Sequence, residues 1–152
     1  MRFDDLGSSK VSLGTDVAFN EEFGYSISVG DVNGDGFDDT LVGSRHDDYL
    51  CSGSNCGAAY LYFGGFLEEE DPTEISYLDF DAVFRGDQEA DSLGANVDVV
   101  GDLDGDGLPD FMISTDHGWN ETDPSAGPGA VLVYTASMWS GTYEETDAEF
   151  AF

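Results

Sequence analysis

Short stretches in which apolar and polar residues alternate run along this chain. Tyr25, Ile27 and Val29 are separated by two serines, and Val97 and Val99 are separated by an aspartate. Successive side chains of a β-strand point to opposite faces, so a period of two predicts strands. No period of 3.6 residues competes with it in these stretches. The pattern therefore predicts an all-β protein.

The same order of segments occurs twice along the chain. Residues 30–39 read GDVNGDGFDD, and residues 101–110 read GDLDGDGLPD. Asp102 follows Asp31 by 71 positions (102 − 31). The flanking segments follow at nearly the same offset, with 40–44 corresponding to 111–115 and 57–63 to 129–134. A fixed offset over several segments indicates an internal repeat.

Each repeat ends in a fourth predicted strand, Phe80–Phe84 in the first and Ala148–Phe152 in the second. A related segment, Lys10–Leu13, precedes the first repeat. Four short antiparallel strands per repeat are typical of a β-propeller blade. The predicted fold is two four-stranded antiparallel blades plus one extra N-terminal outer strand, with an N-terminal segment at 1–22, the first blade at 23–85 and the second at 86–152.

Two blades are fewer than a propeller needs, because propellers typically close with about 4 to 8 blades. The extra N-terminal strand would belong to a preceding or partner blade, and an unpaired strand edge invites association. We therefore expect other copies of the chain, or further repeats, to complete the structure.

Each repeat carries an acidic loop between its first two predicted strands. Oxygen-bearing side chains stand at loop positions 1, 3, 5 and 9, and the backbone carbonyl of position 7 can join them. Ca²⁺ takes about 6 to 8 oxygen ligands, and glycines at positions 4 and 6 permit the turn that aims these oxygens inward. Mg²⁺ fits less well, since it prefers a small octahedron that retains water. The sequence predicts two Ca²⁺ sites, one formed by Asp31, Asn33, Asp35, Phe37 and Asp39, the other by Asp102, Asp104, Asp106, Leu108 and Asp110.

Three other interpretations of these loops fit the pattern less well. An acidic turn without metal would have to occur twice at the same place in a repeat. An EF-hand loop needs a bidentate glutamate at position 12, where this chain has Val42 and Ile113. A dockerin repeat would continue into a helix, whereas 40–44 reads TLVGS. The flanking strands favour a calcium loop within a β-structure.

The repeats resemble FG-GAP repeats, the β-propeller repeats of integrin alpha chains and many bacterial surface proteins. Phe23 and Gly24 supply the FG pair, the acidic loops match the family's Ca²⁺ site, and 57–65 resembles its third strand. The resemblance covers roughly residues 10–152. In the second repeat Leu93 and Gly94 replace the FG pair, and neither repeat has the GAP word intact.

The chain is strongly acidic, with 33 Asp and Glu against 4 Lys and Arg and a net charge of −29. This charge repels nucleic acid and anionic membrane surfaces and attracts cations. The sequence also lacks an apolar run long enough to cross a membrane. We expect neither nucleic-acid binding nor membrane insertion.

The two cysteines, Cys51 and Cys56, lie in a loop of small residues. We favour a local disulfide over two free thiols or half of a soft-metal site. A disulfide implies an oxidising compartment, and hence an extracellular or cell-surface location.

His46 and His117 occupy equivalent positions in the two repeats, 71 residues apart (117 − 46), and we interpret them as inherited polar loop residues. Asn120 begins an Asn-Glu-Thr glycosylation sequon. The resemblance implies that these loops lie on the face opposite the calcium loops, where a protein or glycan ligand could bind.

No catalytic motif is found in the sequence. The first hypothesis is a non-enzymatic, extracellular Ca²⁺-binding FG-GAP module with a structural, adhesive or assembly role. One alternative is a subunit of an extracellular filament or ring. The other is an accessory propeller fragment of a larger secreted hydrolase, identifiable from the full gene.

Overall fold

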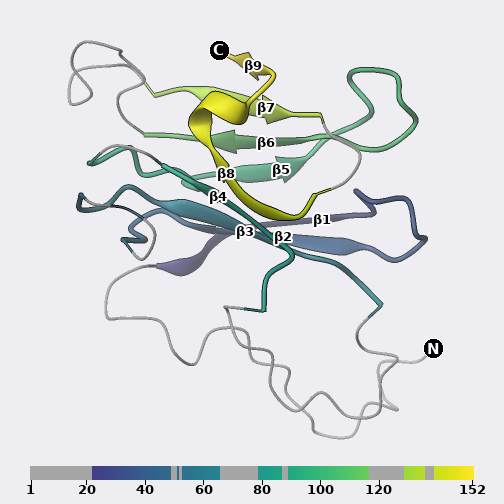
Figure 1. The fold of residues 1–152 in the computed structure, drawn as a ribbon, viewed down its shortest axis with the longest axis horizontal. Coiled ribbons are helices and arrows are strands. Elements are labelled where there is room, and N and C mark those ends of the chain that lie inside the picture. Colours follow the sequence, from purple (N-terminus) through teal and green to yellow (C-terminus); the bar gives the residue numbers. More distant parts are fainter. Residues whose placement is uncertain are drawn as a thin grey trace, which may run out of the picture.

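The computed structural model describes residues 22–48, 51, 53–65, 79–86, 89–116, 129–135 and 139–152. Its strands form two sheets that lie one above the other (Figure 1). The first sheet has the order β1-β2-β3-β4-β8, and the second has the order β5-β6-β7-β9. The strands of the first sheet are β1 (Phe23–Gly30), β2 (Asp39–Ser44), β3 (Ala58–Tyr62), β4 (Ala82–Arg85) and β8 (Gly141–Glu144). Those of the second are β5 (Val97–Val99), β6 (Phe111–Ser114), β7 (Val131–Tyr134) and β9 (Phe150–Ala151), and a short 3-10 helix spans Glu145–Asp147.

The predicted fold class is confirmed. In each repeat the four strands pair antiparallel in chain order, as in a propeller blade. The register also repeats, because Ile27 pairs with Val42 as Val97 pairs with Ile113. The two sheets are open, so they represent two blades and not a closed ring.

One strand was missed by the sequence analysis. Strand β8 comes from the second repeat but pairs in parallel with β4 of the first, Phe84 lying opposite Tyr143. An ion pair between Arg85 and Glu144 joins the same two strands. Four residues reading GTYE show no alternation, so this strand depends on contacts with β4 and not on a local pattern. The extra outer strand predicted at Lys10–Leu13 lies outside the described residues.

The main core lies between the two sheets and is rich in aromatic residues. Phe84 is fully buried, and the centroid of its ring lies 5.0 Å from that of Phe111 and 4.7 Å from that of Tyr134. Trp139 and Tyr143 complete the cluster, with Tyr143 stacked on Phe84. This core fixes one sheet on the other and so determines how the loops at their ends lie.

Candidate metal centres

Both acidic loops connect the first two strands of their repeat. The loop Asp31–Asp39 links β1 to β2, and the loop Asp102–Asp110 links β5 to β6. The two loops touch, since a Cβ added at Gly34 would overlap the side chain of Leu108. The core therefore places the two candidate sites side by side at one end of the molecule.

The second loop brings three carboxylates together. One oxygen from each of Asp102, Asp104 and Asp106 lies within 4.8 Å of the others, and all three side chains are exposed. Backbone amides hold these groups in place: Asp102 accepts from the N–H groups of Gly105 at 2.6 Å and Gly107 at 2.9 Å. The loop thus presents a preformed cluster of oxygen atoms.

The first loop repeats this pattern of hydrogen bonds. Asp31 accepts from the N–H groups of Gly34 at 2.7 Å and Gly36 at 2.9 Å, and Asn33 Oδ1 accepts from the N–H of Asp35 at 2.9 Å. Gly34 and Gly36 have φ angles of +77° and +91°, which residues with a side chain seldom adopt. These two glycines allow the amides to point at the carboxylates inside the loop.

The position-9 aspartates differ from the others because they are buried. Asp39 accepts from the N–H of Val32 at 2.9 Å and from the N–H of Gly64 at 2.8 Å, so it ties the loop to the end of β3. Asp110 accepts from the N–H of Leu103 at 2.6 Å. Burial raises the pKa of the Asp39 carboxyl and of the Asp110 carboxyl above their ordinary values. Both side chains brace their loops, a role the sequence analysis did not assign.

The donor set fits a hard divalent cation. The Asp and Asn side chains of both loops offer oxygen, and Ca²⁺ prefers oxygen ligands in a flexible geometry. Carboxylates about 4 Å apart repel one another by around 4 kcal/mol per pair at an effective dielectric constant near 20. A bound cation would remove this repulsion. The part played by the carbonyl groups of Phe37 and Leu108 remains a prediction from the sequence.

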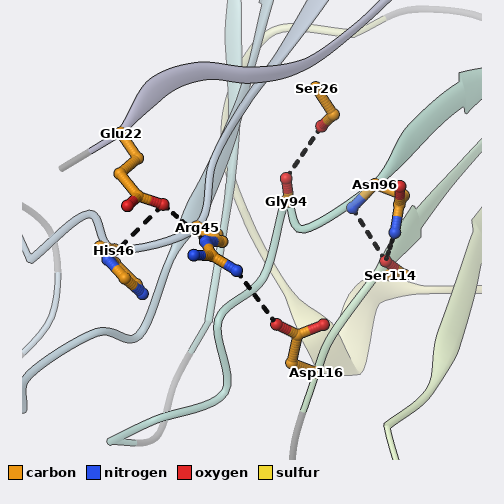
Figure 2. A network of polar contacts seen from close by, with 8 residues as sticks. All are labelled: Glu22, Ser26, Arg45, His46, Gly94, Asn96, Ser114 and Asp116. Carbon is orange, nitrogen blue, oxygen red and sulfur yellow. Dashed lines mark hydrogen bonds and ion pairs between the residues drawn. The ribbon is translucent and has the colours of Figure 1, made fainter.

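A polar network joins the two sheets at the other end of β2 (Figure 2). Arg45 Nε lies 2.6 Å from a carboxylate oxygen of Glu22, and Arg45 Nη1 lies 3.8 Å from a carboxylate oxygen of Asp116. The hydrogen bond from Arg45 lowers the pKa of Glu22 below its ordinary value. The guanidinium also lies over the ring of Tyr25, 4.0 Å from its centroid. Arg45 therefore bridges the first repeat to the second.

The structure describes some of the remaining candidate residues, namely the two cysteines and one of the two histidines. Cys51 and Cys56 form the predicted disulfide. His46 lies in the polar network, with Nδ1 3.7 Å from Glu22. His117 and Asn120 lie outside the described residues, so the role of His117 and the glycosylation of Asn120 stay predictions. Among the described residues, no helix is long and apolar enough to cross a membrane.

Comparison with known proteins supports the resemblance. Residues 23–62 match the family model described as FG-GAP repeat. Over 136 residues, or 84% of this chain, the sequence is 29% identical to integrin alpha ina-1 of Caenorhabditis elegans, covering 11% of that protein. Over 118 residues, or 74% of this chain, it is 36% identical to human integrin alpha-IIb, covering 10% of that protein. The chain thus spans about a tenth of the length of these relatives.

Proposed function

The chain belongs to the FG-GAP repeat family, and on this premise we propose that it is a non-enzymatic, extracellular Ca²⁺-binding module with a structural or adhesive role. The observation that carries the proposal is the convergence of Asp102, Asp104 and Asp106 in one loop of the repeat. The matching hydrogen bonds around Asp31 in the other loop support a second site of the same kind.

The cation would act on the fold and not on a reaction. Each loop is the hairpin between the first two strands of a blade, and three of these four strands, β2, β5 and β6, contribute side chains to the core between the sheets. Binding that occurs only in the folded chain stabilises the folded chain. In this proposal Ca²⁺ holds the two hairpins in the geometry that lets one sheet pack on the other.

The proposed extracellular location agrees with the presence of a disulfide. The Cys51–Cys56 disulfide persists in oxidising surroundings, such as the outside of a cell.

The adhesive part of the proposal comes from the similarity to integrin alpha chains. In this proposal the ligand is an extracellular protein or a glycan. The ligand would bind the loops that carry Arg45 and His46, at the opposite end of β2 from the calcium loop.

A calorimetric titration with Ca²⁺ tests the proposal directly. The unaltered chain should bind two ions, and Asp35→Ala and Asp106→Ala should each leave one, because each removes a central carboxylate from one loop. Combining the two substitutions should abolish binding.

Asp38→Ala is the matched control for this titration. Asp38 is an exposed carboxylate in the same loop, but it stands at position 8 and is not a proposed ligand. This variant should still bind two ions. An equal loss of binding in the Asp38 variant would show a diffuse charge effect and contradict two defined sites.

A further inference from the structure

The disulfide-bonded loop lies against the chain that connects the two blades. Cys51 and Cys56 close this loop, and residues 89–93 stand between β4 and β5. We call residues 89–93 the connecting segment. Its N–H groups donate to three successive carbonyls of the loop, from Ala90 to Ser54 at 2.9 Å, from Ser92 to Asn55 at 3.0 Å and from Leu93 to Cys56 at 3.0 Å. We call these three hydrogen bonds the clasp.

The loop and the connecting segment meet backbone on backbone. Gly57 pairs in parallel with Leu93. A Cβ added at Gly57 would lie 2.3 Å from the carbonyl oxygen of Leu93, and a Cβ added at Gly53 would lie 2.9 Å from the Cβ of Glu89. Both separations are too short for atoms that are not bonded. Glycine is therefore required at these positions for the loop to approach closely enough to form the clasp.

The backbone at the clasp is held in an unfavourable conformation. The φ angles of Asn55, Ala90 and Ser92 are +56°, +68° and +54°, in the left-handed region that residues with a side chain seldom adopt. Such angles persist only where the surrounding contacts impose them. The N–H of Asn55 is itself bound by the carboxylate of Asp48. The connecting segment would therefore relax if the hydrogen bonds of the clasp were lost.

The connecting segment is also tied to the second blade. Leu93 is fully buried in the core between the sheets. The carbonyl of Asp91 accepts from the N–H of Asp116 at 3.1 Å, and the Asp116 side chain pairs with Arg45 (Figure 2). A change at the clasp would therefore reach both the core and the polar network at the end of β2.

The two sulfur atoms differ in exposure. Cys56 is fully buried, whereas Cys51 is half-buried, so an incoming thiolate reaches the Sγ of Cys51. A dithiol reductant would attack there, breaking the S–S bond and releasing Cys56 as a thiolate. The second thiol of the reductant then displaces Cys51, and the reductant ends as a disulfide. The two protons of the dithiol pass through solvent to the two cysteine thiolates.

We propose that the Cys51–Cys56 disulfide is a redox switch that closes the clasp when oxidised and opens it when reduced. The cross-link limits the conformations of the short loop and so keeps its carbonyls opposite the connecting segment. Reduction by a dithiol restores that freedom and releases the connecting segment, while the strands of each blade stay paired. The switch goes beyond the proposed function and requires no bound Ca²⁺.

Hydrogen exchange of the full chain, followed by NMR for each N–H group, tests the switch. Reduction with dithiothreitol should speed exchange at Ala90, Ser92 and Leu93 by roughly 10- to 50-fold, the range that the chain-entropy account gives for so short a loop. The N–H of Thr115, which donates to Ala130 at 2.9 Å in the second blade, is the internal reference and should keep its rate. Reoxidation should restore slow exchange at the clasp.

Two further variants test the cross-link and the contact separately. The combined Cys51→Ser and Cys56→Ser variant should exchange fast at the clasp with or without dithiothreitol. Gly53→Ala keeps the disulfide but crowds Glu89, so it should speed exchange at Ala90 in the oxidised chain. Gly101→Ala is its matched control, because a Cβ at Gly101 meets no atom within 4 Å, and it should leave this exchange unchanged.

Equal exchange at the clasp in the oxidised and reduced chains would overturn the proposal. A reduced chain in which Thr115 exchanges as fast as the clasp would also overturn it, because reduction would then unfold the blades. The metal proposal is judged separately, by counting bound Ca²⁺ on the same samples. A chain that binds no Ca²⁺ but shows the expected exchange refutes the metal sites and leaves the switch standing.

Discussion

Replacing Phe84 with alanine should lower the free energy of unfolding by about 3–5 kcal/mol, the usual cost of removing a buried phenylalanine. The side chain is fully buried between the sheets, and its ring contacts four other aromatic rings. Its loss leaves a cavity where the first sheet meets the second, and rigid strands on both sides limit collapse. Urea denaturation followed by circular dichroism measures this change.

Two variants separate the packing effect from other causes. Phe84→Leu keeps most of the volume and should cost less than Phe84→Ala. Phe152→Ala changes the same residue type at the equivalent position of the other repeat, where the side chain is 80% exposed, and should cost little. Equal losses for Phe84→Ala and Phe152→Ala would mean that the core between the sheets does not hold the blades together.

Much of the fold follows from local pattern. The repeat offset and the period of two predicted every strand of the two blades among the described residues, because strand residues and turn glycines act over a few positions. The parallel pairing of β8 with β4 did not follow, since residues 141–144 gain their partner only when the repeats fold together. The alternation of apolar and polar residues in β1 also did not predict which face of this strand is buried. Ile27 is 60% exposed although its partner in the sheet, Val42, is 1% exposed.

In the candidate metal sites, too, some features could be predicted from the sequence and others depend on tertiary contacts. The spacing of Asp102, Asp104 and Asp106 predicted their convergence, because a short loop with two glycines has few ways to fold. The bracing of Asp39 by the N–H of Gly64 was not predictable, since these residues lie 25 positions apart. The bridge from Arg45 to Asp116 likewise needs both sheets in place. The sequence predicts the candidate ligands and the turn within each loop, whereas the contacts that tie the loop to the rest of the fold come from tertiary structure.

The proposed metal sites would neutralise only part of the acidity. Two Ca²⁺ ions would change the net charge from −29 to −25 (−29 + 4). Most of the remaining carboxylates must therefore be screened by salt, which shortens their reach to roughly 8 Å at physiological ionic strength.

Removing Ca²⁺ should destabilise the chain by about 5 kcal/mol. A ligand at a hundredfold excess over its dissociation constant stabilises the folded state by about 2.7 kcal/mol per site, and there are two proposed sites. For a chain of this size, such a loss corresponds to a fall of roughly 10–20 °C in the melting temperature. The carboxylates of each loop would then repel one another without a counter-ion. Thermal unfolding with and without a chelator measures the shift.

The variant that combines Asp35→Ala with Asp106→Ala makes this experiment specific. It should unfold at the same temperature with and without the chelator, because neither loop retains its central carboxylate. A melting temperature of the unaltered chain that does not respond to the chelator would contradict a structural role for Ca²⁺. A chelator effect that persists in the combined variant would place the stabilising ion elsewhere than in these two loops. Only a shift that is present in the unaltered chain and absent from the combined variant ties the stability of the two blades to the metal loops.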